Sequence, residues 1–341
     1  MNGVVLVTDH PSGDGLEPER DVLAPLGLEL VVADSTDPEH LLELAQRGID
    51  GILACYAQVT AEIIEAAAAT GCRVVSRYGI GYDNVDVAAA TRAGVVVTTV
   101  PDYCLDEVAD HTLALLLAVA RGVDQTSGAV RDGRWELPQR PVHRLVGRTV
   151  ALIGLGAIGR RVAARVRAFG LEVIAYDPLA DRASIQEVAW AETLEAAFAE
   201  ADFISLHVPL TDDTRHIVNG RSLAAATRAP ILINTSRGGL VDLEALALAL
   251  DAGQLTAAAL DVTEPEPLPG DHPFRDDPRV LITAHSAFHS EESRYELQRR
   301  AAQEVARALK GERPQNPRNP EVLSSTGFAG RSNVSTAQSR P

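Results

Sequence analysis

Three segments in the second half of the chain each carry a side chain suited to proton or anion chemistry. Arg237, Glu266 and His285 lie within residues 234–239, 261–267 and 283–287. An arginine binds a carboxylate through paired hydrogen bonds, and a histidine beside a carboxylate can hold and transfer a proton. Each segment follows a predicted strand, and ligands of open α/β sheets bind at the carboxyl ends of strands, so we expect one shared crevice. Taken singly, the residues could be a surface ion pair, a loop residue between prolines and a histidine with structural partners.

A glycine-rich turn follows the predicted strand at 149–153. It contains Gly154, Gly156 and Gly159 in the pattern GxGxxG, and a helical pattern begins at once. In this context the first glycine permits a tight turn, the second lets the backbone approach a pyrophosphate, and the third lets the helix pack on the strand. Amides at the helix N-terminus, including those of Ala157 and Ile158, would donate to the anion. Glycines also mark ordinary turns, but this context predicts a dinucleotide site.

Asp177 follows the next predicted strand, Glu172–Tyr176, and lies 18 residues beyond Gly159. That separation is close to the one expected for the acid that binds the ribose hydroxyls. A carboxylate there repels the 2′-phosphate of NADP, and Pro178 supplies no cation to receive it, so we predict NAD as the cofactor. The alternative is a solvated aspartate at a strand end.

The charge balance limits the partners of the chain. Its 341 residues include 47 acidic and 31 basic side chains, for a formal net charge of −16. Nucleic acid and anionic lipid would be repelled unless a basic patch intervened, and basic residues occur singly or in pairs. We expect neither partner. The single lysine, Lys310, ends a predicted helix, which disfavours a pyridoxal-phosphate or Walker-type site.

Targeting and metal signals are missing from the pattern. Residues 1–9 show no secretory signal, and the longest apolar stretch, 112–120, is about half of the roughly 20 residues that span a bilayer. The three cysteines are odd in number and widely spaced, which indicates reduced thiols, and their spacing does not suit zinc. We expect a cytoplasmic protein without a metal.

Strand-like runs rich in valine and isoleucine alternate with helical patterns, which predicts an α/β fold with parallel sheets. The first series of strands is predicted at 4–8, 28–32, 51–53, 74–76 and 95–97. The second is predicted at 149–153, 172–176, 203–207, 231–234, 257–260 and 280–283. Six strands with crossover helices complete a doubly wound sheet.

Two long helices and a polar tail complete the prediction. Residues 103–121 are apolar on nearly every face, so this helix is either a core helix between domains or also part of a subunit interface. A helix over 291–309 leads the chain back toward the first domain. Residues 321–341, polar from Ser324 onward, are predicted to be disordered.

Together, the three segments and the glycine motif resemble the D-isomer-specific 2-hydroxyacid dehydrogenases, from about Val74 to Leu309. Residues 77–86, 100–103 and 107–111 make the chain most similar to the branch of D-3-phosphoglycerate dehydrogenases and C-terminal-binding proteins. The resemblance implies a Rossmann cofactor domain, residues 101–289, inserted in a flavodoxin-like substrate domain, residues 1–100 and 290–320. We also expect a homodimer, for which the helix at 103–121 is the candidate interface.

The resemblance assigns the catalytic roles. Arg237 would orient the substrate carboxylate and carbonyl, His285 would exchange the proton with the C2 oxygen, and Glu266 would hold the histidine. This suits reduction of a 2-oxo acid, because negative charge develops on the carbonyl oxygen as hydride arrives and a cationic donor must be near it. A neighbouring carboxylate favours the protonated imidazole.

The resemblance also extends the site beyond the catalytic residues. Substrate binding would use Arg77 and the backbone of Gly79, Ile80 and Gly81. The remaining cofactor contacts would come from His207 and Pro209 on the adenine side, from Thr214, from Thr235 near the nicotinamide ribose, and from Asp261 at the carboxamide. His207 alone could equally be a core residue at a strand end.

The sequence departs from the family pattern after His285. The segment continues as Ser286-Ala287-Phe288-His289, which puts the identity of the substrate in doubt and makes His289 a competitor for proton transfer. A dehydrogenase of phosphite or of a phosphonate-bearing oxo acid is an alternative. A second alternative is an NAD-sensing binding protein similar to the C-terminal-binding proteins, although intact Arg237, Glu266 and His285 favour an enzyme.

Overall fold

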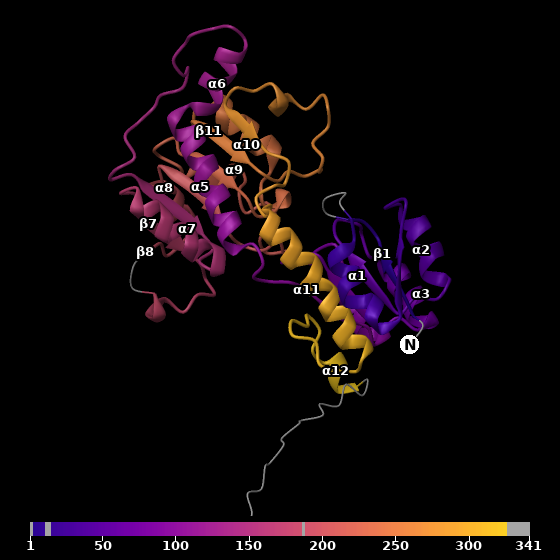
Figure 1. The fold of residues 1–341 in the computed structure, drawn as a ribbon. Helices are drawn as coiled ribbons and strands as arrows, with labels where there is room; N and C mark the ends of the chain where they lie inside the picture. The colour runs from indigo at the N-terminus through magenta and orange to yellow at the C-terminus, as the bar shows by residue number, and fades with distance from the viewer. Residues whose placement is uncertain (1–2, 11–14, 186–187, 326–341) are drawn as a thin grey trace, which may run out of the picture. The chain divides into compact units, whose positions relative to one another are not determined.

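The computed structural model describes residues 3–10, 15–185 and 188–325 (Figure 1). The chain divides into two compact units. The first runs to Tyr103 and resumes at Glu291, and the second spans Cys104–Ser290. The sequence predicted the two boundaries between the units near residues 100 and 290. Assignment of the substrate to the first unit stays a prediction.

The described part of the first unit is built on a five-stranded parallel sheet with the order β2-β1-β3-β4-β5, which is the flavodoxin-like order. Its strands are β1 (Gly3–Val7), β2 (Leu28–Val32), β3 (Gly51–Ala54), β4 (Val74–Arg77) and β5 (Val96–Thr98). Its helices are α1 (Glu17–Leu23), η1 (Ala24–Leu26), α2 (Pro38–Gln46), α3 (Ala61–Thr70), α4 (Val87–Ala93), α11 (Glu291–Leu309) and α12 (Val322–Ser325).

Helices cover both faces of this sheet because its strands are apolar on both sides. The apolar residues of α2, α3 and α4 pack in one core with β3 and β4. The long helix α11 contacts β3, β4 and α1. The helix predicted at 291–309 is therefore confirmed, and it belongs to the first unit although it follows the second in sequence.

The described part of the second unit contains a seven-stranded parallel sheet in the order β12-β11-β10-β9-β6-β7-β8. From β6 outward this is the Rossmann order with one added strand. The strands are β6 (Thr149–Ile153), β7 (Glu172–Tyr176), β8 (Ala189–Trp190), β9 (Phe203–Leu206), β10 (Ile231–Asn234), β11 (Ala257–Leu260) and β12 (Val280–Ile282). The prediction of six strands was wrong, because β8 is only two residues long and its pairing with β7 leaves no periodic pattern.

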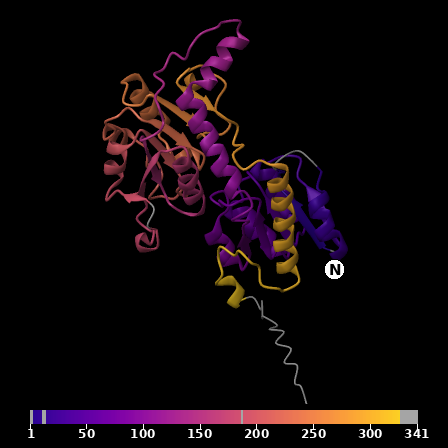
Figure 2. The same ribbon diagram turned by 60° about the vertical axis from the view of Figure 1, so that its left-hand side comes forward.

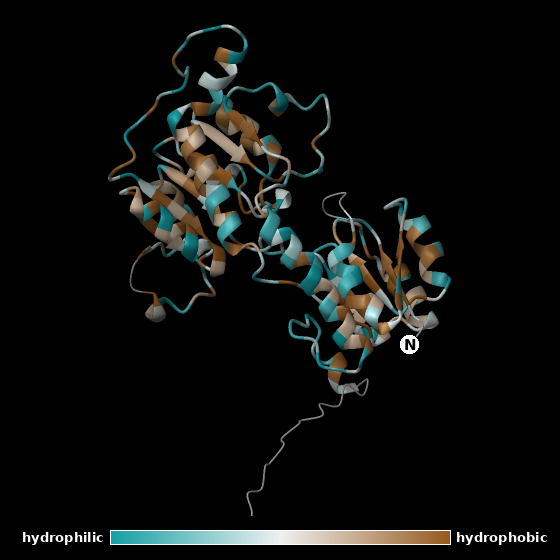
Figure 3. Ribbon diagram, in the orientation of Figure 1, coloured by the Kyte–Doolittle hydropathy of each residue, from teal (hydrophilic) through white to brown (hydrophobic). Residues whose placement is uncertain are grey.

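The helices of the second unit form two layers. One layer contains α5 (Leu105–Arg121) and α7 (Ala157–Ala168), which share a core with the strands. The other contains α8 (Leu194–Glu200), α9 (Gly220–Ala224) and α10 (Leu243–Asp251), packed on the opposite face. The remaining helical segments are α6 (Val123–Arg131), η2 (Arg182–Ser184), η3 (Gly238–Leu240) and η4 (Pro273–Arg275). Apolar colouring follows the strands of each unit (Figure 3).

Helix α5 corrects one expectation. It is not apolar all round, because Asp106 and Asp110 form an exposed face and both pair with Arg165 of α7. Its other face, including Leu115, Leu116 and Val119, is buried against the sheet. Figures 1 and 2 show the helix along this sheet in both views.

The predicted disorder of residues 321–341 was partly wrong. Val322 and Leu323 are apolar, and their side chains are buried in the short helix α12. Residues 326–341, which carry the rest of this prediction, lie outside the described residues. None of the described helices combines the length and apolar character needed to cross a membrane.

Candidate active site

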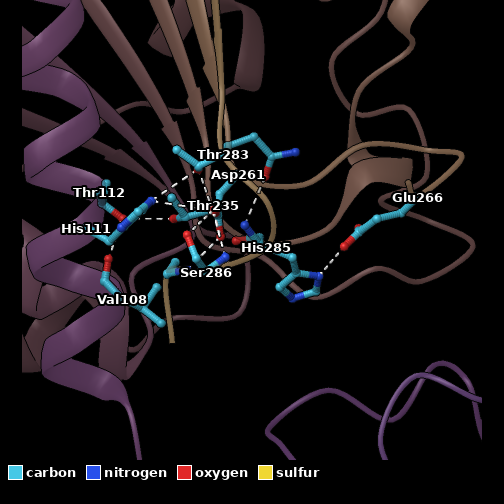
Figure 4. Close-up of polar contacts among 12 residues, drawn as sticks. Val108, His111, Thr112, Thr235, Asp261, Glu266, Thr283, His285 and Ser286 are labelled. Atoms are coloured by element: carbon cyan, nitrogen blue, oxygen red, sulfur yellow. Dashed lines mark hydrogen bonds and ion pairs between the residues drawn. The ribbon is translucent and has the colours of Figure 1, made fainter. Parts of the chain in front are cut away.

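The side chains of Glu266 and His285 meet at the carboxyl edge of the seven-stranded sheet (Figure 4). His285 follows β12, and Glu266 lies in the loop after β11. The His285 Nδ1 atom lies 2.6 Å from Glu266 Oε1; the imidazole is half-buried, and the Glu266 side chain is exposed. Because Nδ1 is engaged by the carboxylate, Nε2 is the ring nitrogen that would exchange a proton with a ligand. The spacing of the two segments did not show which nitrogen of the ring meets the carboxylate.

The backbone of His285 is held in an unusual conformation by Asp261. His285 has φ of 49°, in the left-handed region that non-glycine residues rarely adopt. Its amide donates to the Asp261 carbonyl at 2.8 Å, and the amides of Ser286 and Ala287 donate to the Asp261 carboxylate at 2.9 Å each. Three consecutive amides therefore bind one residue, which fixes the turn carrying the imidazole.

The carboxylate of Asp261 is charged although it is buried. Burial opposes its ionisation, but hydrogen bonds from His111, Thr283 and the two loop amides hold its pKa well below the usual range. The sequence predicted contact with the nicotinamide carboxamide for this residue. In the structure its carboxylate is occupied by the His285 loop, and the carboxamide contact stays a prediction.

Arg237 lies on the loop after β10, next to the loop that leads to Glu266. Its Nη1 donates to the Ser236 carbonyl at 2.8 Å, and the Asn234 side chain donates to the Arg237 carbonyl at 2.8 Å. A Cβ on Gly238 would lie 2.0 Å from the Thr263 carbonyl, so only glycine allows the two loops to pack together. Sequence reasoning missed Gly238, although it directly follows the arginine.

The glycine-rich turn has the geometry that its three glycines predict. Gly154 has φ of 94°, and a Cβ on it would lie 2.7 Å from the His207 carbonyl group. A Cβ on Gly159 would lie 2.4 Å from the Gly154 oxygen, so this glycine permits close packing of α7 on the turn. Gly156, in contrast, has an ordinary φ of −72° and nothing within 4 Å of its Cβ position. No neighbouring protein atom requires glycine at this position.

Asp177 lies beside the glycine-rich turn at the end of β7. Its Oδ2 accepts from the Leu155 amide and its Oδ1 from the Leu179 amide, each at 2.9 Å. The first bond ties the turn to the second strand of the sheet. The carboxylate is thus fixed near the start of α7, where the predicted ribose contact would lie.

The other predicted cofactor residues have different surroundings. Nδ1 of His207 is buried without a partner among the described residues, Nε2 pairs with Ser205 at 2.9 Å, and burial lowers the pKa of His207 to about 4. Thr214 donates to the carbonyl of Pro209 at 2.6 Å and shapes that loop. Thr235 is buried, and its hydroxyl lies 2.8 Å from that of Thr112.

The predicted substrate residues lie in the first unit, at the end of β4. Gly79 has φ of 146°, and a Cβ there would collide with the guanidinium of Arg77. Arg77 is buried, and its Nε has no hydrogen-bond partner among the described residues. The Gly79 amide donates to the Arg77 carbonyl at 2.9 Å, and its expected contact with the substrate stays a prediction. The amides of Ile80 and Gly81 have no acceptor in the described part of the chain.

Two polar residues of α5 were not predicted to act at this edge. His111 and Thr112 reach Asp261, Thr283 and Thr235 (Figure 4). The segment at 107–111 contributed to the family resemblance, but the sequence could not show where it lies. His289 has no acidic partner among the described residues; its ring contacts Phe288, and its amide donates to the Ser286 carbonyl. No group of three or more metal-ligating side chains occurs among the described residues.

Comparison with known proteins places this site in a family. Residues 113–287 match the model of the D-isomer specific 2-hydroxyacid dehydrogenase NAD binding domain. The chain is 37% identical to the glyoxylate reductase of Korarchaeum cryptofilum over 306 residues, 88% of each protein. The chain belongs to the D-isomer-specific 2-hydroxyacid dehydrogenase family. It is thus an oxidoreductase of 2-hydroxy and 2-oxo acids that uses NAD or NADP.

Other members differ in length and cofactor. The chain is 36% identical over 314 residues to the D-3-phosphoglycerate dehydrogenase of Methanocaldococcus jannaschii, covering 92% of this chain but 58% of that protein. Among solved structures, the TT0316 protein of Thermus thermophilus has a TM-score of 0.83 at 37% identity, with coverage of 92% and 99%. The NADPH-dependent glyoxylate/hydroxypyruvate reductase of Sinorhizobium meliloti, in complex with NADP and malonate, has a TM-score of 0.82 at 29% identity, with coverage of 93% and 97%.

Proposed function

We propose that this dehydrogenase transfers hydride between NAD and C2 of a small D-2-hydroxy acid or 2-oxo acid, with His285 as the acid and base. The observation that carries the proposal is the 2.6 Å contact between His285 Nδ1 and Glu266. A carboxylate at Nδ1 keeps a proton on that nitrogen and fixes the orientation of the ring, so Nε2 is the nitrogen that would exchange a proton with the substrate oxygen. In the opposite direction, Nε2 of the neutral ring accepts the hydroxyl proton.

Arg237 is proposed to bind the substrate carboxylate and the carbonyl oxygen. A guanidinium forms two parallel hydrogen bonds to a carboxylate and stays charged at all physiological pH values. The guanidinium also stabilises the negative charge that develops on the carbonyl oxygen during reduction. Its loop packs on the Glu266 loop through Gly238, which favours a common role for the two residues.

The cofactor is proposed to lie on the glycine-rich turn, where bound NADH would supply the hydride. The open space over Gly156 and the α7 N-terminus fit a pyrophosphate, with Ala157 and Ile158 as amide donors. Asp177 would bind the ribose hydroxyls, and its charge would disfavour the 2′-phosphate of NADP. Further contacts with the cofactor are proposed as the family resemblance implies them, from His207, Pro209, Thr214, Thr235 and Asp261.

In the first unit, Arg77 is proposed to bind the anionic end of the substrate. It is a buried cation with an unpaired Nε, and such a charge is costly without an anionic partner. The Ile80 and Gly81 amides are proposed as further donors to the substrate carboxylate. Small acids such as glyoxylate and hydroxypyruvate, the substrates named for two relatives, fit this donor set.

The test is NADH oxidation with a panel of 2-oxo acids, including glyoxylate, hydroxypyruvate, pyruvate and 3-phosphohydroxypyruvate. We expect reduction of at least one of them, loss of that activity in His285→Ala, and a D-configured product by chiral chromatography. Oxidation of phosphite with NAD, without reduction of any oxo acid, would support the alternative substrate class instead. Tight NADH binding without turnover of any compound would favour a cofactor-sensing protein.

We also propose a homodimer built on the region of α5 and its continuation. The buried face of α5 packs inside its own unit, whereas the following segment exposes large apolar side chains. They are Val123, Val130, Trp135, Leu137 and Val146, with Trp135 92% exposed. Exposed apolar side chains gathered over one stretch of the chain are suited to contact with a second copy. Sedimentation of the wild type and of Trp135→Glu tests this, and a monomeric wild type would refute it.

A further inference from the structure

Helix α5 places two consecutive polar side chains at the edge of the sheet where the catalytic loops begin (Figure 4). Nε2 of His111 lies 3.2 Å from the Thr283 hydroxyl and 3.4 Å from Asp261 Oδ1. The neighbouring Thr112 hydroxyl lies 2.8 Å from that of Thr235. Asp261 and Thr283 precede His285, and Thr235 precedes Arg237. One helix therefore touches the bases of both loops.

The direction of these hydrogen bonds follows from the number of hydrogens. The Thr283 hydroxyl donates its single hydrogen to Asp261 Oδ1, so its oxygen can only accept from His111. Nε2 of His111 consequently carries a hydrogen that points at both Thr283 and Asp261. In the same way, Thr112 donates to the Val108 carbonyl at 2.7 Å, so Thr235 must donate to Thr112.

The hydrogen bonds from His111 and Thr283 satisfy the carboxylate of Asp261, which in turn fixes the 283–287 turn. Asp261 is 1% exposed, and its carboxylate binds the amides of Ser286 and Ala287. A buried carboxylate keeps its charge and position only while its oxygens are satisfied. His111 is the member of this network that comes from another element, and it also orients the Thr283 hydroxyl.

We propose that His111 is a positioning residue: through Thr283 and Asp261 it holds the 283–287 turn in the conformation that directs His285 toward Glu266. The left-handed φ of His285 is the strained feature that this network maintains. The proposal rests on the proposed function of His285 for its catalytic consequence. Its structural part, fixation of the turn, stands apart from that function.

The experiment compares three variants in the full chain. His111→Leu removes the donor, His111→Gln retains a donor at nearly the same position, and Asn219→Ala serves as the control. Asn219 caps α9 in the same unit, so its loss lowers stability without a contact to the 283–287 turn. The first readout is hydrogen exchange of the amides of residues 285–287. The second is kcat and KM for glyoxylate, or for the best substrate of the panel, with NADH.

We expect exchange at residues 285–287 to accelerate at least tenfold in His111→Leu and to stay within threefold of wild type in the other two variants. We expect kcat to fall at least tenfold in His111→Leu, with KM for NADH changed less than threefold. Rescue by glutamine separates positioning from general destabilisation.

Unchanged exchange at these amides in His111→Leu would overturn the proposal, as would an equal loss in His111→Gln. Accelerated exchange with unchanged kcat, in an enzyme inactivated by His285→Ala, would overturn the catalytic part. If His285→Ala remained fully active, the proposed function would fail instead, and the exchange data would still decide whether His111 holds the turn.

Discussion

Replacement of Gly156 by alanine separates the cofactor site from the stability of the fold. Gly156 has φ of −72° and ψ of −159°, an extended conformation that alanine can adopt, and the space around its Cβ position is open to 4 Å. A glycine-to-alanine change at a compatible site stabilises a protein by about 0.4–1 kcal/mol, because it restricts the unfolded chain. Gly156→Ala should therefore be as stable as wild type or slightly more stable.

Cofactor binding should change in the opposite direction. If the pyrophosphate approaches the backbone at Gly156, the added methyl group occupies its position and displaces it from the helix amides. Loss of one or two such hydrogen bonds weakens NADH binding at least tenfold, equivalent to about 1.4 kcal/mol or more. If Gly156 were needed only for the shape of the turn, alanine would lower the free energy of unfolding. An unchanged or higher free energy of unfolding together with weaker NADH binding therefore indicates a contact with the cofactor.

The assay combines NADH titration by fluorescence with urea unfolding. Gly220→Ala is the matched control, because a Cβ on Gly220 also has open space, and Gly220 begins α9 without a predicted cofactor contact. Gly159→Ala should lose about 1–3 kcal/mol of stability through its 2.4 Å overlap with the Gly154 oxygen. An unchanged NADH affinity in Gly156→Ala would refute the placement of the pyrophosphate on this turn.

Four further predictions test individual side chains. Arg237→Lys keeps the charge but loses the paired hydrogen bonds, so kcat/KM should fall at least 100-fold, or about 2.7 kcal/mol. A loss below threefold in steady-state kinetics would mean that another residue binds the substrate carboxylate. In wild type, kcat/KM should be more than tenfold higher with NADH than with NADPH, or about 1.4 kcal/mol. Asp177→Asn keeps an acceptor for the Leu155 amide but loses the charge, so it should reduce this ratio. Equal kcat/KM values with both cofactors in wild type would contradict the role of Asp177. Glu266→Gln removes the carboxylate that holds Nδ1 of His285, so kcat for oxo-acid reduction should fall at least tenfold while KM for NADH changes less than threefold. Steady-state kinetics with an unchanged kcat would remove Glu266 from the catalytic set. Burial lowers the pKa of His207 from 6.5 to about 4, so between these pH values the unfolded chain binds a proton and the folded chain does not, and stability is lost as pH falls from about 6.5 to about 4. Between pH 7 and pH 4.5, the free energy of urea unfolding should fall by about 2–3 kcal/mol more in wild type than in His207→Gln. Equal losses would contradict a buried neutral ring.

The sequence alone determined the features that depend on local patterns. Strands such as Thr149–Ile153, Glu172–Tyr176 and Ile231–Asn234 were predicted to the residue, because continuous apolar runs bounded by turn residues are buried strands of parallel sheets. The glycine-rich turn was also predictable, since its positive φ at Gly154 and its close approach at Gly159 require glycine at fixed spacing. The two-residue strand β8 was not, because two residues carry no period.

The tertiary structure decided which side chains act on one another. Glu266 and His285 are separated by 19 residues, and only the adjacency of β11 and β12 brings Oε1 within 2.6 Å of Nδ1. His111 lies 172 residues before Thr283, so no local pattern links them. Asp261 could be predicted as a residue of the site, but its hold on the 283–287 turn could not. The position of a strand end follows from local periodicity, whereas a hydrogen bond between strand ends depends on strand order and helix packing, which non-local contacts determine.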